Sequence, residues 1–173
     1  MCLPIRIAGI TRDSIVDGPG IRTTFYVQGC PHHCPGCHNP ETWPFEGGSE
    51  MFPADLFAMV KENPLCKGVT LSGGEPFAQA EALLPFAKML KEANYELASF
   101  SGYTIEQLLT GTEAQRALLS KIDVLIDGPF LLKERSLELS FRGSRNQRIL
   151  NVPESIRQGR AVLENSPRWL GEY

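Results

Sequence analysis

The sequence predicts an α/β protein in which parallel β/α units form an open, incomplete barrel of the TIM type. Short runs rich in β-branched and aromatic residues alternate with helical patterns, and short loops connect them. Cysteine- and glycine-rich motifs follow the predicted strands, at the edge where parallel β/α folds collect their functional groups. Because only about five strands are predicted, a closed eight-stranded barrel is not expected. We expect a single domain over residues 1–173.

The first predicted strand, 23–28 (Thr-Thr-Phe-Tyr-Val-Gln), is β-branched and aromatic and leads directly into a cysteine-rich loop. The next three end at glycine-containing turns, and a shorter candidate follows near the C-terminus. These strands are predicted at 68–72, 96–101, 122–126 and 148–152.

Helical patterns fill the gaps between the strands. The first follows Pro53, a residue suited to a first helical turn, and places apolar residues at Leu56, Met59 and Val60. The second runs from Ala80 towards a cap at Asn94 and contains Pro85, so this helix is expected to begin late or to bend. Two capping boxes predict short helices: Thr104 with Gln107, and Thr112 with Gln115.

Composition limits the possible classes of function. The chain has 42% hydrophobic residues, 21% charged residues and a net charge of −3, which fits a globular protein and argues against broad nucleic-acid binding. We find neither an apolar stretch of membrane-spanning length nor the apolar core of a signal peptide, so we expect a cytoplasmic protein without a membrane partner. Lys and Arg are concentrated in 133–160, which is most simply explained as a solvated face.

Three cysteines, Cys30, Cys34 and Cys37, lie in one short loop with the spacing C-x3-C-x2-C. In a reducing compartment such a group indicates metal binding or catalysis rather than disulfides. Three thiolates leave one position of a four-ligand iron–sulfur cluster open, as a catalytic metal site requires. The residues alone leave open a c-type haem at Cys34-Pro-Gly-Cys37-His38, which would not explain Cys30, or a zinc site completed by a histidine. The histidines available for zinc are His32, His33 and His38.

Three further motifs lie at turns or strand ends. Ser72-Gly73-Gly74-Glu75-Pro76 offers glycines that let a ligand approach the backbone and a carboxylate that could accept hydrogen bonds from an ammonium group. Asp17-Gly-Pro-Gly-Ile-Arg22 is a stiff turn ahead of the first predicted strand. Segment 141–148 (Phe-Arg-Gly-Ser-Arg-Asn-Gln-Arg) is rich in donors for a carboxylate, a phosphate or a partner peptide. Taken alone, each motif is also explained as an ordinary turn or loop.

Together these motifs resemble the radical S-adenosylmethionine superfamily and, within it, the activating enzymes of glycyl-radical enzymes. C-x3-C-x2-C followed by Gly-Gly-Glu at the next strand resembles the superfamily, and Asp-Gly-Pro-Gly-Ile-Arg resembles the activases. Three further motifs resemble the branch that serves anaerobic ribonucleoside-triphosphate reductase. They are Cys37-x-Asn39 with Thr42-Trp43, Asp127-Gly128, and the Arg-Gly-Ser-x-Asn-Gln run of 142–147. The resemblance extends over 7–152, most of the chain.

The resemblance implies one 4Fe–4S cluster on Cys30, Cys34 and Cys37, with its fourth iron chelating S-adenosylmethionine. Residues expected beside that ligand are Gly36, Cys37, His38, Gly73, Gly74, Glu75, Ser101, Gly102 and Asp127. The implied reaction is reductive cleavage to methionine and a 5′-deoxyadenosyl radical, which takes hydrogen from a glycine of the partner protein. No side-chain acid or base is required, so no catalytic residue is assigned.

The implied partners are a large glycyl-radical protein, anaerobic ribonucleoside-triphosphate reductase, and an electron donor of the flavodoxin type. The short barrel leaves its rim open, which gives the basic segment 133–160 a possible docking role. The alternatives are an activase of another glycyl-radical enzyme, another small radical enzyme, or, from a different class, a zinc-binding interaction module.

Overall fold

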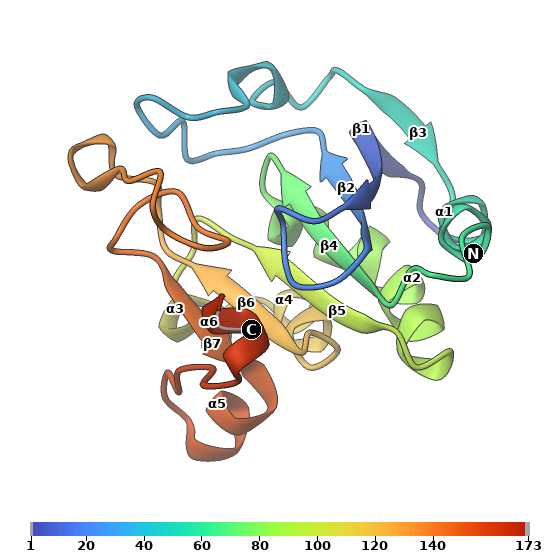
Figure 1. Cartoon of the computed structure of the whole chain (residues 1–173). Coiled ribbons are helices and arrows are strands. Elements are labelled where there is room, and N and C mark those ends of the chain that lie inside the picture. Colours follow the sequence, from blue (N-terminus) through green and yellow to red (C-terminus); the bar gives the residue numbers. More distant parts are fainter. Residues whose placement is uncertain (1, 172–173) are drawn as a thin grey trace.

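The computed structural model describes residues 2–171, which form a seven-stranded sheet with the order β3-β1-β2-β4-β5-β6-β7. The four strands from β2 to β6 in this order are parallel to one another. Because β3 and β7 lie at opposite ends of the order, the sheet is open (Figure 1). The expected open α/β class is confirmed. The parallel strands are β2 (Arg22–Val27), β4 (Gly68–Gly73), β5 (Glu96–Phe100) and β6 (Val124–Asp127).

The fifth predicted strand is present as β7 (Arg148–Asn151), and it runs antiparallel to β6. Asp127, the last residue of β6, pairs with Arg148, the first residue of β7. The chain therefore leaves and re-enters the sheet at the same edge, without the crossover helix that a parallel pair needs. As a result, segment 128–147 lies over the carboxyl ends of the parallel strands.

Two strands were not predicted from the sequence. β1 (Ile5–Ser14) pairs antiparallel with β2, and β3 (Ser49–Met51) pairs antiparallel with β1. Irregular register between Ile7 and Gly9, and again before Ser14, interrupts the alternation of apolar and polar residues that would reveal β1.

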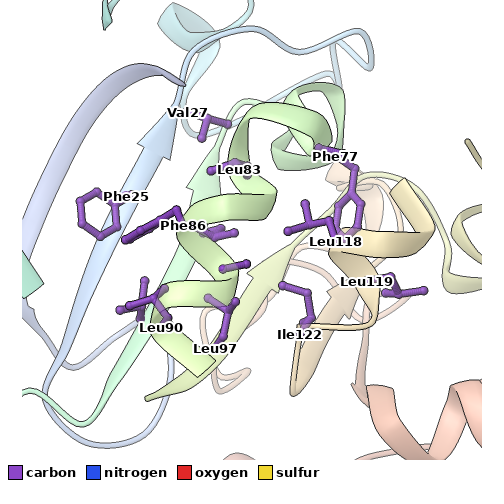
Figure 2. Close-up of a cluster of buried hydrophobic side chains, with 14 of the residues drawn as sticks. Phe25, Val27, Phe77, Leu83, Phe86, Leu90, Leu97, Leu118, Leu119 and Ile122 are labelled. Atoms are coloured by element: carbon purple, nitrogen blue, oxygen red, sulfur yellow. The ribbon is translucent and has the colours of Figure 1, made fainter. Parts of the chain in front are cut away.

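Helices cover one face of the sheet, with α2 and α4 behind the strands in Figure 1. Figure 2 shows how side chains from the sheet and from these helices interlock. Phe25 of β2 meets Phe86 edge to face, with ring centroids 5.3 Å apart. Burying each of these large apolar side chains contributes about 2–3 kcal/mol. The larger of the two clusters of buried apolar residues lies on this face of the sheet. The helices here are α1 (Pro53–Lys61), α2 (Ala80–Glu92), α3 (Ile105–Leu109) and α4 (Glu113–Leu119).

Local sequence signals explain how these helices begin and end. Both predicted capping boxes are present, at the start of α3 and of α4. α2 ends in a Schellman motif, in which Asn94 adopts a φ of +65° and the Tyr95 amide donates to the Leu90 carbonyl at 3.0 Å. α2 continues through Pro85, which leaves the Glu81 carbonyl without its helical donor on the solvent side. Every helix within residues 2–171 is too short or too polar to span a bilayer.

The opposite face of the sheet is covered by the C-terminal segment. Trp169 of α6 (Pro167–Leu170) is buried against Ala98, Val124 and Ile126, whereas Leu97 and Leu125 belong to the helix-covered core. This division follows from the alternation of side chains along each strand. α6 follows α5 (Val152–Gln158), which begins directly after β7.

Arg22 ties this second layer to the sheet. Its side chain is only 2% exposed, donates to Thr70 at 3.0 Å and forms an ion pair with Glu96 at 2.8 Å. Arg168 of α6 pairs with the same carboxylate at 2.9 Å, and the Arg22 guanidinium lies 5.3 Å from the centre of the Trp169 ring. Burial acts to raise the pKa of Glu96, but the hydrogen bond and charge of Arg22, with the charge of Arg168, lower it below its ordinary value.

Glu96→Gln is expected to reduce the free energy of unfolding by about 3 kcal/mol at neutral pH, because it leaves Arg22 buried without its anion. Since the folded pKa is lowered, this stabilisation is present above the unfolded-state pKa of about 4.3 and is lost as the pH falls through the folded value. Urea unfolding of both proteins from neutral pH to about pH 3 should show the difference shrinking at the acid end. The control, Glu50→Gln, removes the more exposed pair with Arg6 and should change stability by less than about 1 kcal/mol. A difference for Glu96→Gln that does not vary with pH would contradict this account.

Candidate functional site

The parallel strands direct their loops to one edge, where two adjoining cavities lie. The smaller has a volume of about 100 Å³ and the larger about 450 Å³, and the two share Cys37, Gly73 and Phe130 in their walls. The smaller cavity is lined mainly by residues of the cysteine loop and of the loops after β4 and β5: Cys30, His32, Cys34, Cys37, Trp43, Gly73, Gly74, Ser101 and Gly102. Motifs far apart in the sequence are thus brought to one place.

The carboxylate of Glu75 joins three of these loops. It is fully buried (0% exposed), and its oxygens accept hydrogen bonds from the Ser101 hydroxyl at 3.0 Å and the Gly102 amide at 2.7 Å. The Phe77 amide donates at 3.0 Å and His32 Nε2 lies at 2.7 Å. Because an ionised carboxylate can only accept, the imidazole nitrogen of His32 is the donor in this contact. A ligand that binds to Glu75, as expected from the sequence, would therefore have to share the carboxylate oxygens with four donors of the chain itself.

The two glycines before Glu75 permit a close approach of backbone to backbone. Gly74 donates to the Val27 carbonyl and Glu75 donates to the Gly29 carbonyl, both at 2.8 Å. A Cβ on Gly74 would lie 2.3 Å from the Gly29 oxygen, and Gly73 adopts a φ of +91°. Only glycine fits both positions without displacing the backbone that leads into the cysteine loop.

The cysteine loop is closed by its own backbone. The Gly29 amide donates to the Thr42 carbonyl at 2.7 Å, and the Cys30 amide donates to the Trp43 carbonyl at 3.1 Å. Burial raises the pKa of the Cys30 thiol above its ordinary value, and hydrogen bonds from the backbone of His32 and His33 act in the opposite direction. Three thiols in the wall of one small cavity are a donor set that fits an iron–sulfur cluster, in which each cysteine binds a different iron.

The three histidines that could complete a zinc site each contact another group. His32 reaches Glu75 and meets the Tyr103 ring at 4.5 Å between centroids. His33 stacks on Trp43 at 4.7 Å with an interplanar angle of 7°, and His38 lies 5.2 Å from the Phe130 ring. Within residues 2–171, no three His, Cys, Asp or Glu side chains converge as ligands of one ion. The contacts of the histidines favour a donor set made of cysteines only.

Besides Glu75, which is wholly buried behind the walls, two of the expected ligand-binding residues lie away from the cavities. Gly36 is exposed and faces Leu132, which would be 2.8 Å from an added Cβ. Asp127 is 1% exposed, accepts the Ile105 amide at 2.8 Å and pairs with Arg148 at 2.6 Å. The structure therefore gives Asp127 a role in fixing the start of α3 and β7, and contact with a ligand stays a prediction for both residues. The other expected residues, including His38 in the larger cavity, line the walls.

Several wall residues were not predicted individually from the sequence. Gln147 lines both cavities, accepts the Gly143 amide at 2.9 Å and donates to the Gly128 carbonyl at 3.2 Å. Asn146 donates to the Pro129 carbonyl at 2.7 Å, so the donor-rich segment 141–148 is hydrogen-bonded to the loop that carries Phe130. Its polar character was visible in the sequence, but its partner in the chain depends on the antiparallel return of β7. The remaining unpredicted residues of the walls include Tyr26, Asn39, Trp43, Phe100 and Phe130.

Comparisons with known proteins show the family of this chain. A family model described as a 4Fe-4S single cluster domain matches residues 16–150. The anaerobic ribonucleoside-triphosphate reductase-activating protein of Haemophilus influenzae is 36% identical over 77% of this chain and 89% of its own length. The protein of the same name from Pasteurella multocida is 39% identical with the same coverage.

Two further matches cover less of the chain. The pyruvate formate-lyase-activating enzyme of Clostridium pasteurianum is 38% identical over 62% of this chain and 49% of its own length. The crystal structure of QueE from Escherichia coli matches with a TM-score of 0.50 and 20% identity, over 58% of this chain and 54% of that one. The similarity to QueE concerns the fold alone.

Glu75→Gln is expected to destabilise the protein by about 3 kcal/mol, because an amide group cannot accept from all the donors that face this carboxylate. Ser101→Ala removes one donor and should cost about 1.5 kcal/mol, the value of one hydrogen bond to a charged group. Urea unfolding under anaerobic conditions measures both changes. Equal stability of Glu75→Gln and the unmodified chain would show that this carboxylate does not hold the loops together.

Proposed function

Because this chain belongs to the 4Fe-4S single-cluster family and, within it, to the anaerobic ribonucleoside-triphosphate reductase-activating proteins, we propose that it is a radical enzyme that installs a glycyl radical on such a reductase. One observation carries the proposal. The thiols of C-x3-C-x2-C line one cavity with Gly73 and Gly74 at the carboxyl ends of the parallel strands, and the buried Glu75 carboxylate holds Ser101 and Gly102 in the same wall.

Cys30, Cys34 and Cys37 would hold three irons of a 4Fe–4S cluster and leave the fourth iron for the amino and carboxylate groups of S-adenosylmethionine. Bound there, the cluster would supply one electron for cleavage of the sulfonium carbon–sulfur bond, so that methionine would leave and the 5′-deoxyadenosyl fragment would take a hydrogen atom from the partner glycine to give 5′-deoxyadenosine. An electron donor of the flavodoxin type would supply the electron to the enzyme.

The residues of the chain would bind and orient the ligand and would exclude water from it. Gly73, in the wall shared by the cavities, and Gly74, in the wall of the smaller one, would allow a ligand to approach the backbone closely, since neither carries a side chain. Ser101 and Gly102 are fixed by Glu75 and would border the same ligand, with His38 on its other side. We assign Glu75 the role of positioning these groups, because its oxygens accept four donors of the chain itself.

The larger cavity suits the glycine-bearing segment of the partner. Its volume of about 450 Å³ admits the tip of a peptide loop but not a folded element. Aromatic walls from Tyr26, Phe100, Phe130 and Phe141 would keep water away from a reactive carbon. Because the two cavities share Cys37 and Gly73 in their walls, a segment bound in the larger one would lie beside the expected site of the radical.

An activase for another glycyl-radical enzyme is the second candidate, supported by the similarity to a pyruvate formate-lyase-activating enzyme. The chain matches 49% of that relative, compared with 89% of the reductase-activating relative, which favours the reductase as partner.

The first test is anaerobic reconstitution with iron and sulfide, reduction, and an assay for 5′-deoxyadenosine. Cys34→Ala is expected to reduce the product to the level of the cluster-free protein, because it removes one of the three thiolates. Cys2→Ala is the matched control, since Cys2 is an exposed thiol outside the loop and should leave the product unchanged. The glycyl radical is then sought by electron paramagnetic resonance after adding anaerobic ribonucleotide reductase. No product from a fully loaded cluster would refute the proposed function.

The basic segment 133–160 offers a docking surface beside the larger cavity. Within it Arg148 pairs with Glu106 and Asp127, and Arg157 pairs with Glu154. Arg142 donates to backbone carbonyls of its own loop, while Arg145 is exposed at the rim. Arg145 is therefore the side chain through which the docking role can be tested without disturbing the loop.

Arg145→Glu is expected to weaken binding to the reductase about 3- to 10-fold at low salt, with a smaller effect at high salt, as for charges at the rim of an interface. Lys88→Glu makes the same change of charge on α2, which covers the opposite face of the sheet, and should leave binding unchanged. Binding of each variant to surface-immobilised reductase is measured at two ionic strengths. Equal effects of the two reversals would exclude a docking role for this rim.

A further inference from the structure

Gln28 is a buried polar residue at the point where the sheet meets the cysteine loop. β2 ends at Val27, so Gln28 leads directly into Gly29 and Cys30. It is only 5% exposed, although its carboxamide is polar. A buried carboxamide needs hydrogen-bond partners within the chain, and those partners show what the side chain holds in place.

The carboxamide of Gln28 donates to residues 41–44, the segment by which the chain returns from the cysteine loop and which we call the return limb. Nε2 lies 3.1 Å from the Glu41 carbonyl oxygen and 2.6 Å from the Pro44 carbonyl oxygen. The two carbonyls between these accept the backbone amides of residues 29–30. Four consecutive carbonyls of the return limb are thus bonded to three consecutive residues at the start of the loop.

A glutamine suits this position because its carboxamide nitrogen carries two hydrogens, so one side chain can serve two carbonyls. The chain leaves room for this group at Gly47, where an added Cβ would lie 2.9 Å from Gln28 Nε2 and 3.0 Å from Cδ. Arg6 donates to the Gly47 carbonyl at 2.9 Å and so holds this glycine against the sheet. The position of the carboxamide therefore depends on a fixed glycine.

The hydrogen bonds that close the loop are made by backbone groups and one carboxamide, so the thiols stay free for a metal. Closing a loop in advance lowers the entropy that ligand binding must overcome. Cys30, Cys34 and Cys37 lie between the two closed ends and line one small cavity. We propose that Gln28 is a positioning residue for the cluster, because its carboxamide closes the loop and so gathers the three thiols. This inference rests on the proposed function, since it requires a cluster on these cysteines.

The direct test measures amide hydrogen exchange in the reduced, cluster-free protein. Gln28→Met keeps the length of the side chain and removes both donors. The amides of Gly29 and Cys30 are expected to exchange about 10-fold faster in this variant, because the loop opens more easily without two hydrogen bonds. Gly47→Ala should accelerate the same amides, since its methyl group displaces the carboxamide and leaves Gln28 itself unchanged.

Ser155→Ala is the matched control for loss of buried hydrogen bonds. The Ser155 hydroxyl is buried, donates to the Asn151 carbonyl at 2.6 Å and accepts the Val162 amide at 2.9 Å, in the segment after β7. This variant should leave exchange in the cysteine loop unchanged. Equal acceleration by Ser155→Ala would overturn the inference, because the effect would then reflect overall stability. Unchanged exchange in folded Gln28→Met would overturn it as well, and Gly47→Ala decides the question if Gln28→Met does not fold.

The second test follows the cluster itself after anaerobic reconstitution with iron and sulfide. Iron is expected to pass to a chelator about 10-fold faster from Gln28→Met than from the unmodified chain, and at an unchanged rate from Ser155→Ala. The reduced cluster of Gln28→Met should also give a broader electron paramagnetic resonance signal, because the thiolates are less uniformly placed.

Equal iron release and equal line width in Gln28→Met would show that the carboxamide does not position the cluster. That result would overturn the inference and leave the proposed function intact, since a cluster would have formed. Failure of the unmodified chain to form any cluster would overturn both this inference and the proposed function.

Discussion

The site depends on one buried carboxylate. A charge that is wholly removed from water must be compensated by donors, and Glu75 takes four of them from different parts of the chain. Through His32 it fixes the cysteine loop, and through Ser101 and Gly102 it fixes the end of β5. The relative positions of the loops that form the small cavity therefore follow from the requirements of a single ionised group.

A second constraint is the short barrel. With few β/α units, the face of the sheet opposite the helices would expose Ala98, Val124 and Ile126 to water. Trp169 covers them, held by the cluster of charges around Arg22 and Glu96 near the starts of the parallel strands. The half of this face that lies nearer the carboxyl ends of the parallel strands is not covered by Trp169, and it forms part of the wall of the larger cavity. The C-terminal segment thus performs, in a short chain, the covering that further β/α units provide in a closed barrel.

Periodicity and turn chemistry were sufficient to predict the parallel strands, the capping boxes and the edge that carries the site, because these depend on local sequence. β1 was missed because its irregular register with β2 hides the alternation. The contacts of Asp127 could not be predicted, since they depend on the antiparallel return that brings Arg148 beside it. Trp43 and Gln147 belong to motifs that the sequence marks, but only tertiary structure shows which cavity they line.

Hydrogen-bond satisfaction separates the scaffold from the site within these motifs. Asp17 of the Asp-Gly-Pro-Gly-Ile-Arg turn accepts the hydroxyls of Ser14 and Thr24, and Arg22 at its other end is bonded within the sheet. Such residues have their requirements met by the chain, so the fold alone accounts for them. The thiols of the cysteine loop differ, because they are free cysteines in the wall of one cavity and would act as metal ligands only with a group that the polypeptide does not supply. Three free thiols gathered in the wall of one cavity therefore support our proposal that this cavity takes a cluster held by three thiolates.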